Sequence, residues 1–320
     1  MKAVFPAVSV VVSTYQRAER CLRLLRALDR QTLDPSFFEV LVVDNGSTDE
    51  TTAILETYTK EARYLLRPLR IERNRGPAAA RNLGWRLAEA PIIAFTDDDC
   101  VPQTTWLEAG LAAMASDETV GVLQGRTRAP DGVAMDAFPR WGHSQVITSP
   151  TAQFEACNIY YRRQALAQGG GFSEEIGWWG EDASAGWQVV EAGWNRGFSS
   201  APEVIHDVTA RSLRWNLRNG LRDSNLVRLA VKHPGYRAQA FWRPWAFRRV
   251  DAIFALALGG LIVSVRWRPA LVVAVPYAWC RRPGSWTPRG LETVGEAVAV
   301  DAARVMGQLW GTLRYRVAVL

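Results

Sequence analysis

The sequence predicts an α/β domain with a mainly parallel central sheet, followed by a helical C-terminal region. Short apolar runs rich in valine and isoleucine alternate with helix-length segments up to about residue 210. That alternation is typical of βαβ units, which place parallel strands side by side. Beyond residue 210 the chain changes to basic and apolar helical segments. We therefore expect two domains in the 320 residues, one over 1–210 and one over 211–320.

The first hundred residues contain four expected strands, separated by helices. Short apolar runs predict the strands, and Pro77 is well placed for the first turn of a helix. Asn45-Gly46 supplies a turn, and Ser47 or Thr48 can cap the helix that follows. The strands are expected over 8–12, 40–43, 64–71 and 92–96, with one helix burying 21–28 and another over 78–89.

The remainder of the first domain is less regular from residue 120 onward. The sequence Gly169-Gly170-Gly171 indicates a flexible loop, and the segment 168–178 could close over a bound ligand. The elements expected in this part are helices over 103–115 and 180–192 and strands over 154–161 and 204–208.

Three consecutive aspartates, Asp97, Asp98 and Asp99, directly follow the strand at 92–96. Open α/β sheets bind ligands at the carboxyl ends of their strands, which is where these carboxylates converge. Their mutual repulsion and desolvation favour a bound divalent cation, and an oxygen-rich site suits Mg²⁺ or Mn²⁺. A solvated acidic turn is the alternative for these three residues taken alone.

Polar side chains also follow the first two strands. Thr14 and Tyr15 end the first strand, Arg17 comes shortly after, and Asp44 ends the second strand. At this edge a tyrosine can stack on a nucleobase, while Thr14 or Asp44 can hydrogen-bond the base or its ribose. Tyr15 would serve equally well as a capping aromatic, and Asp44 as an ordinary turn residue before Asn45-Gly46.

Arg75 and Arg81 flank the start of the helix at 78–89. A helix N-terminus with arginine nearby is a natural site for a diphosphate. Ordinary surface arginines are the alternative in a chain so rich in them.

Charge is distributed unevenly along the chain. The net charge of +6 combines −7 over residues 1–210 with +13 over residues 211–289, where Asp223 and Asp251 are the two acids. Basic residues interleaved with tryptophan and apolar runs favour an anionic membrane surface as partner. Nucleic acid is the competing partner, and the apolar runs argue against it.

Two apolar runs lie within the basic region, over 252–265 and 270–279. Neither has the roughly 20 residues that a spanning helix needs, and Arg266 and Arg268 would fall at the centre of a joint span. A short hairpin that dips into one leaflet fits better; a buried helical pair or a dimer contact is the alternative. The tryptophans expected near the head groups are Trp242, Trp245, Trp267, Trp279 and Trp286.

The four cysteines show no C-x-x-C pair, which argues against a disulfide framework or a zinc site. This usage suits a reducing cytoplasm. Residues 1–6 carry one lysine and no long apolar stretch, so we expect no signal peptide. We accordingly expect a cytoplasmic protein, peripheral or monotopic at the inner face of the cell membrane.

Five segments in order resemble the inverting family 2 glycosyltransferases of the GT-A fold, over about residues 6–210. Any one of them is weak, but their order and spacing are specific. They are Val11-Val12-Ser13-Thr14-Tyr15, Val42-Val43-Asp44-Asn45-Gly46-Ser47, Asn74-Arg75-Gly76-Pro77-Ala78-Ala79-Ala80-Arg81-Asn82, Asp97-Asp98-Asp99 and Trp179-Gly180-Glu181-Asp182.

The resemblance implies a nucleotide-sugar donor, with UDP as the expected nucleotide. It implies that Asp44 contacts the uracil and makes Arg81 the better candidate for the diphosphate. Asp97 to Asp99 match the family's D-x-D motif, so Asp99 would bind the metal and Asp97 or Asp98 would contact ribose or metal. Relatives use a histidine beyond the G-E-D helix as a further ligand, which points to His206; imidazole suits Mn²⁺ better than Mg²⁺.

The resemblance also places the catalytic base at Glu181-Asp182. We choose Asp182 as the base that takes the acceptor's hydroxyl proton, kept ionised by the helix N-terminus, with Glu181 orienting the acceptor. Trp178 and Trp179 could stack on a sugar ring, or could simply pack. Gln188 departs from the family, since many relatives carry arginine there. The expected acceptor is a lipid-linked saccharide, a polyprenyl phosphate or another amphiphile at the cytoplasmic leaflet.

Two other functions remain open from the sequence. A nucleotidyltransferase would also use metal-binding aspartates on an α/β sheet, but it normally has a glycine-rich loop and a nearby lysine. Here the first strand ends in Ser13-Thr14-Tyr15, and lysine occurs only at 2, 60 and 232. A non-catalytic membrane scaffold or nucleotide-sugar sensor would bind the donor without turnover; the intact Asp97, Asp99, Asp182 and His206 argue against it.

Overall fold

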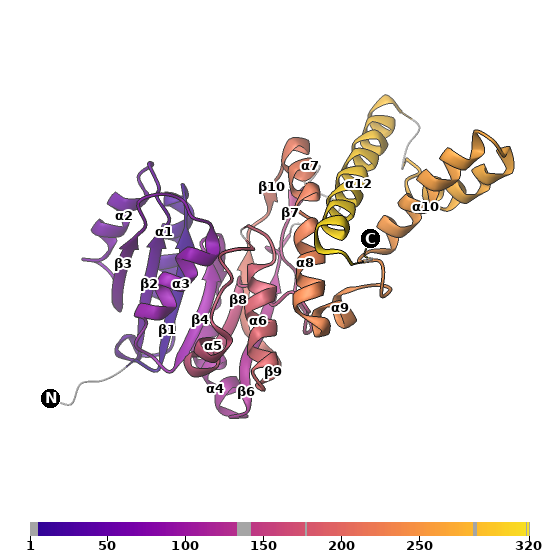
Figure 1. Ribbon diagram of the computed structural model, residues 1–320. Helices are drawn as coiled ribbons and strands as arrows, with labels where there is room; N and C mark the ends of the chain where they lie inside the picture. Colours follow the sequence, from indigo (N-terminus) through magenta and orange to yellow (C-terminus); the bar gives the residue numbers. More distant parts are fainter. Residues whose placement is uncertain (1–5, 133–141, 177, 284–286, 318, 320) are drawn as a thin grey trace. The chain divides into compact units, whose positions relative to one another are not determined.

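The computed structural model describes residues 6–132, 142–176, 178–283, 287–317 and 319. The chain separates into two compact units, Met1–Thr209 and Ala210–Leu320. The first unit is an α/β domain built on an eight-stranded sheet, and the second is helical (Figure 1). The predicted fold class, a mainly parallel α/β sheet followed by C-terminal helices, is confirmed.

The sheet of the first unit has the strand order β3-β2-β1-β4-β8-β6-β9-β5. The first four are parallel to one another, and β8 joins β4 in the antiparallel sense. The strands are β1 (Val8–Thr14), β2 (Phe38–Asp44), β3 (Leu65–Arg70), β4 (Ile92–Asp97), β5 (Cys100–Pro102), β6 (Val120–Arg128), β8 (Asn158–Arg162) and β9 (Asn195–His206), with short β7 (Gly142–His143) and β10 (Thr209–Ala210) outside this sheet.

Helices connect these strands as the alternation predicts. Their apolar faces pack with the valine-rich strands into a core in which β1 and β2 are almost wholly buried. The helices are α1 (Ala18–Leu28), α2 (Thr51–Tyr58), α3 (Pro77–Leu87), α4 (Trp106–Ala115), α5 (Arg163–Gly169) and α6 (Glu181–Glu191), with a 3₁₀ turn η1 (Pro35–Phe37).

The turn at Asn45-Gly46 shows why glycine is needed there. Gly46 has φ 84°, and a Cβ on it would lie 2.9 Å from the backbone of Arg73. Only glycine adopts this conformation and allows this close approach without strain. The turn after β2 is therefore fixed by its sequence, as expected.

Several sequence-based boundaries were wrong. The strand expected over 154–161 corresponds to β8, which begins four residues later. The strand expected over 204–208 corresponds to the end of the much longer β9. The segment expected to be a flexible glycine loop is ordered: Gly169 ends α5, and Phe172 is buried, exchanging hydrogen bonds with Asn82. Long-range pairing and packing decided these ends.

The second unit consists of helices and one 3₁₀ segment. The two helical segments expected over 210–231 and 291–318 correspond to α7 with α8 and to α12, and the apolar run at 252–265 lies in α10. The elements are α7 (Leu213–Leu221), α8 (Ser224–Lys232), α9 (Pro234–Ala240), α10 (Arg249–Ser264), η2 (Arg268–Ala274), α11 (Val275–Cys280) and α12 (Pro288–Tyr315). Among the described residues, none of the helices combines the length and apolarity needed to cross a membrane.

Candidate active site

The pairing of β1 with β4 brings Thr14 to the aspartate turn. These strands run parallel with Ser13 opposite Asp97, so the residues that follow, Thr14 and Asp98, become neighbours. The Thr14 hydroxyl donates a hydrogen bond to Asp98 Oδ2 over 2.8 Å, and both side chains are buried. The two predicted donor-site segments therefore meet at one edge of the sheet.

Arg17 binds two of the three aspartates. Its Nη1 lies 2.7 Å from Asp98 Oδ1 and 2.9 Å from Asp99 Oδ2. The preceding residue, Gln16, has φ 56° and donates its backbone N–H to Ser47 Oγ. Burial raises the pKa of Asp98 to about 6; Arg17 and Thr14 oppose this rise, and Asp99 adds to it.

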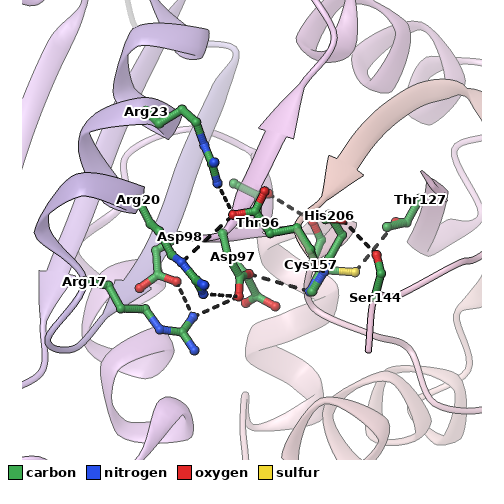
Figure 2. Close-up of polar contacts among 12 residues, drawn as sticks. Arg17, Arg20, Arg23, Thr96, Asp97, Asp98, Thr127, Ser144, Cys157 and His206 are labelled. Atoms are coloured by element: carbon green, nitrogen blue, oxygen red, sulfur yellow. Dashed lines mark hydrogen bonds and ion pairs between the residues drawn. The ribbon is translucent and has the colours of Figure 1, made fainter. Parts of the chain in front are cut away.

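Two further arginines, not singled out from the sequence, reach the same acidic cluster (Figure 2). Arg20 Nη1 lies 3.5 Å from Asp99 Oδ2, and Arg23 forms an ion pair with Asp207. Residues three apart on a helix share a face, so the spacing of Arg17, Arg20 and Arg23 was the signal available in the sequence. Together with Arg17, these two arginines balance the negative charge of Asp98, Asp99 and Asp207 at this edge of the sheet.

His206 joins Asp99 through the pairing of β5 with β9, in which Cys100 lies opposite His206. His206 Nε2 is 3.6 Å from Asp99 Oδ1, and its Nδ1 is 2.8 Å from the carbonyl oxygen of Asp207. Because a carbonyl oxygen only accepts, Nδ1 carries a proton, and Nε2 faces the carboxylate. A cation between Nε2 and the carboxylate would receive a ligand atom from each.

Asp99, Cys100 and His206 form a possible metal-binding group among the residues that the structure describes. Their ligand atoms all lie within 4.8 Å of one another. Burial raises the pKa of the Cys100 thiol well above its usual value, which keeps it protonated and a poor ligand. The remaining carboxylate and imidazole suit Mn²⁺, and the backbone carbonyl on Nδ1 orients the histidine as in metal sites generally.

Asp97 lies in a different set of contacts. Arg81, which is buried, places one nitrogen 3.0 Å from Asp97 Oδ1 and another 2.9 Å from Glu181 Oε1. The guanidinium thus joins the end of β4 to the start of α6. Arg81 was expected at the diphosphate and Asp97 at the metal; in the structure their side chains bind each other.

α6 begins with the predicted pair of acids. Its N-cap is Gly180, in the left-handed conformation with φ 94°, and Glu181 and Asp182 form the first turn. Burial raises the pKa of Asp182 well above its usual value, and the charge on Glu181 raises it further. We expected the helix N-terminus to keep Asp182 ionised; burial raises its pKa and so opposes that effect. Once ionised, such a carboxylate is a stronger base than an exposed aspartate.

The other residues predicted to bind the nucleotide-sugar either have protein partners or face solvent. The buried Asp44 carboxylate accepts hydrogen bonds from Ser47 N, Thr52 Oγ1 and Arg70. Tyr15 is 41% exposed, which leaves its ring free to stack. Arg75 lies at the surface, 2.9 Å from Glu174 Oε2.

Of the predicted acceptor residues, Trp178 is 51% exposed and Trp179 is half-buried. They come shortly before α6, and Trp178 ends the segment expected to close over a ligand. Gln188, the residue that departs from the family pattern, donates a hydrogen bond to the Gly169 carbonyl over 2.8 Å. This hydrogen bond connects α6 to the end of α5.

Comparison with known proteins identifies the family of the chain. A sequence model described as Glycosyl transferase family 2 matches residues 9–171. Glycosyltransferase AglE of Haloferax volcanii is 32% identical over 180 residues, which are 55% of this chain. Validoxylamine A glucosyltransferase of Streptomyces hygroscopicus subsp. limoneus is 28% identical over 281 residues, 74% of this chain. The match spans 59% of the length of each relative.

Solved structures show the same fold. The mannosyltransferase PcManGT from Pyrobaculum calidifontis, in complex with GDP-Man and Mn²⁺, has a TM-score of 0.61 at 22% identity. The similarity covers 98% of this chain and 86% of that one. TarS of S. aureus in complex with UDP has a TM-score of 0.51 at 20% identity, covering 97% and 91%. With the family model matching half of its length, the chain belongs to glycosyltransferase family 2, and its first unit has the GT-A fold.

Proposed function

We propose that this enzyme moves a sugar from a nucleoside-diphosphate sugar to a hydroxyl group of a lipid-linked or other glycan acceptor, with inversion at the anomeric carbon. The observation that carries the proposal is the meeting of Thr14, Arg17, Asp98, Asp99 and His206 at the carboxyl edge of the sheet. Nucleotides bind at this edge in open α/β folds. UDP remains the expected nucleotide, with Tyr15 and Asp44 near the base.

Asp99 and His206 would hold a divalent metal, Mn²⁺ or Mg²⁺, with Asp97 and Asp98 nearby. The ion would stabilise the negative charge that develops on the departing nucleoside diphosphate. Arg17, with Arg20 beside it, would bind the diphosphate oxygens, and Arg75 is an exposed cation available to the same anion. Arg81 is a positioning residue here, since both ends of its guanidinium bind acids.

Asp182 would act as the general base. As the acceptor oxygen bonds to the anomeric carbon, the bond from that carbon to the diphosphate oxygen breaks and the hydroxyl proton passes to Asp182. The raised pKa of Asp182 strengthens it as a base when ionised. Glu181, bound to Arg81, fixes the start of α6 and keeps a negative charge next to the base. Trp178 and Trp179 would contact the acceptor sugar.

The acceptor is proposed to lie at an anionic membrane surface, at the cytoplasmic face of the cell membrane. Residues 211–289 carry a net charge of +13, and their apolar segments include many exposed side chains. Such a region would hold the enzyme at the bilayer, where a lipid-linked acceptor resides. Membrane contact is peripheral or monotopic in this proposal.

Calorimetric titration with UDP, GDP and dTDP, each with and without Mn²⁺, tests the donor site. We expect metal-dependent binding of one nucleotide, UDP first, and loss of that dependence in Asp99→Ala. Asp131→Ala, at an exposed position outside the site, is the matched control. If one nucleotide binds with Mn²⁺ but the sugar of the corresponding nucleotide-sugar is neither transferred nor hydrolysed, the protein is a sensor. If no nucleotide shows metal-dependent binding, the donor site is refuted.

A further inference from the structure

The hairpin formed by α10, η2 and α11 exposes an unusually apolar surface. Ile262 is 70% exposed and Val265 is 83% exposed, where a soluble helix would carry polar groups. Soluble monomers rarely expose contiguous apolar patches of this kind unless they bind something. The large exposed apolar residues here are Leu256, Leu258, Leu261, Ile262, Val263, Val265, Trp267, Leu271, Val272, Val273, Val275 and Trp279.

A groove of about 420 Å³ is hollowed into this hairpin between α10 and η2. Its lining consists entirely of apolar side chains and glycines, and Trp245 and Trp267 form part of it. The volume falls within the range of about 300–1,000 Å³ that is usual for small-molecule sites. Because the lining offers no charged or hydroxyl side chain, the groove suits a hydrocarbon.

Two neighbouring glycines shape the groove in different ways. A Cβ on Gly260 would lie 2.8 Å from the Ala270 carbonyl oxygen, so glycine there lets η2 approach α10. A Cβ on Gly259 would meet no atom within 4 Å, although Gly259 lines the groove. The space beside Gly259 is therefore open, and a larger residue would fill it.

The surroundings of the groove are positively charged. Arg266 and Arg268, both exposed, flank Trp267 in the sequence. The two acids within residues 211–289, Asp223 and Asp251, are buried and bind Arg248. An anion is therefore favoured next to the apolar groove.

We propose that the groove between α10 and η2 holds one hydrocarbon chain of an anionic membrane lipid. Arg266 and Arg268 bind the phosphate of its head group, and Trp245 and Trp267 lie at the boundary between chain and head group. This inference rests on the proposed membrane contact of the helical region. Lipid binding in the groove does not depend on nucleotide-sugar binding or on sugar transfer.

The charge pattern favours a lipid over a second copy of this chain. In a two-fold dimer built on this surface, the basic apolar patch would face its own copy, and among residues 249–283 the one acid, Asp251, is buried and cannot pair with the partner's arginines. The phosphate of an anionic lipid supplies the missing negative charge. The surface is therefore complementary to an anionic amphiphile and not to itself.

Binding of a soluble, short-chain lipid tests the groove without a bilayer. Dihexanoyl phosphatidylglycerol, below its micelle concentration, is titrated calorimetrically into the wild type, Gly259→Leu and Gly295→Leu. Leucine is a better helix former than glycine, so both variants should fold. Gly295 lies in α12, and a Cβ there also meets no atom within 4 Å, which makes it the matched control.

We expect saturable binding by the wild type and by Gly295→Leu, and at least tenfold weaker binding by Gly259→Leu. Glycerol phosphate, which lacks the chain, should bind at least tenfold more weakly than the lipid, and Arg266→Gln/Arg268→Gln should lose the preference over dihexanoyl phosphatidylcholine. Equal lipid binding by Gly259→Leu and the wild type would overturn the proposal. A wild-type protein that forms a dimer and shows no lipid binding would also overturn the proposal. Nucleotide binding measured on the same samples separates failure here from failure of the donor site.

Discussion

The two units of the chain differ in how many large apolar side chains they expose. Among the described residues, six large apolar side chains are exposed in Met1–Thr209 and twenty-two in Ala210–Leu320. Both units bury polar and charged groups; in the helical unit, Asp251, Asp301 and Gln308 are fully buried. Asp251 binds Arg248, and Asp301 binds Arg281 and Tyr277.

This difference indicates two different surroundings. The α/β unit buries its apolar residues and gathers charges around a site at its sheet edge, as a soluble enzyme does. The helical unit exposes many more large apolar side chains, as surfaces that bind an apolar partner do. The chemistry of the chain is thus expected in the first unit and its attachment in the second.

The sharpest test of this division is Asp182→Asn. Because a positioned general base contributes about 10²–10⁴-fold, transfer should fall by up to about 10⁴-fold. Nucleotide binding and attachment to anionic vesicles should be unchanged, as measured by calorimetry and pelleting. Glu191→Gln, at the other end of α6, is the control. Near-normal turnover in Asp182→Asn would show that the base lies elsewhere.

The converse test charges the apolar surface. Ile262→Glu/Val265→Glu/Val272→Glu should reduce partitioning to vesicles containing phosphatidylglycerol by about a hundredfold or more, because burying one such side chain is worth about 1.5–3 kcal/mol. Nucleotide affinity should stay constant. Leu65→Glu, at an exposed position in β3, controls for added charge. Undiminished pelleting of the folded triple variant would assign the apolar surface to a protein contact.

Asp98 should make the α/β unit sensitive to pH. Its folded-state pKa of about 6 lies above the ordinary aspartate value of 3.8, so the folded protein binds the proton more tightly than the unfolded chain does. The stabilisation by that proton is complete below about pH 4 and is lost as pH rises through 6. Relative to Asp98→Asn, the wild type should lose on the order of 3 kcal/mol of unfolding free energy between pH 4 and 7.

Thermal unfolding of both proteins across this pH range measures the difference. Asp131→Asn, at an exposed position, is the control and should follow the wild type. Parallel curves for the wild type and Asp98→Asn would mean that the Asp98 carboxylate is not penalised by burial.

The smallest expected effect concerns Arg17, which forms ion pairs with Asp98 and Asp99 near the proposed metal position. Arg17→Gln should bind Mn²⁺ alone more tightly, because a cation that competes for Asp99 is removed. The gain should be at most about fivefold, since the Arg17 side chain is 40% exposed and such ion pairs are worth about 1 kcal/mol or less. Nucleotide binding should weaken instead.

Titration with Mn²⁺, first alone and then with UDP, separates these two effects. Arg23→Gln, whose partner is Asp207, serves as control. Weaker Mn²⁺ binding in Arg17→Gln would show that Arg17 supports the metal position and does not compete for it.

Local patterns were sufficient to predict the strand ends that carry the site. The apolar runs before Thr14, Asp44 and Asp97 are short and β-prone, so their carboxyl ends had to meet at one sheet edge. The acids of α6 were found from a segment shared with the family. Arg20 and Arg23 were missed because arginine on an exposed helix face is common, and only their target, the acidic cluster, distinguishes them.

The sequence by itself determined the parallel α/β order, the acidic turn at Asp97–Asp99 and the contrast between an acidic first domain and a basic helical region. Tertiary structure decided which of these groups touch. The three-residue strand β5 has no pattern of its own, yet its pairing with β9 places His206 beside Asp99. Likewise, Arg81 joins residues 16 and 100 positions away. Such contacts depend on the register of distant strands and on burial, which local sequence periodicity does not encode.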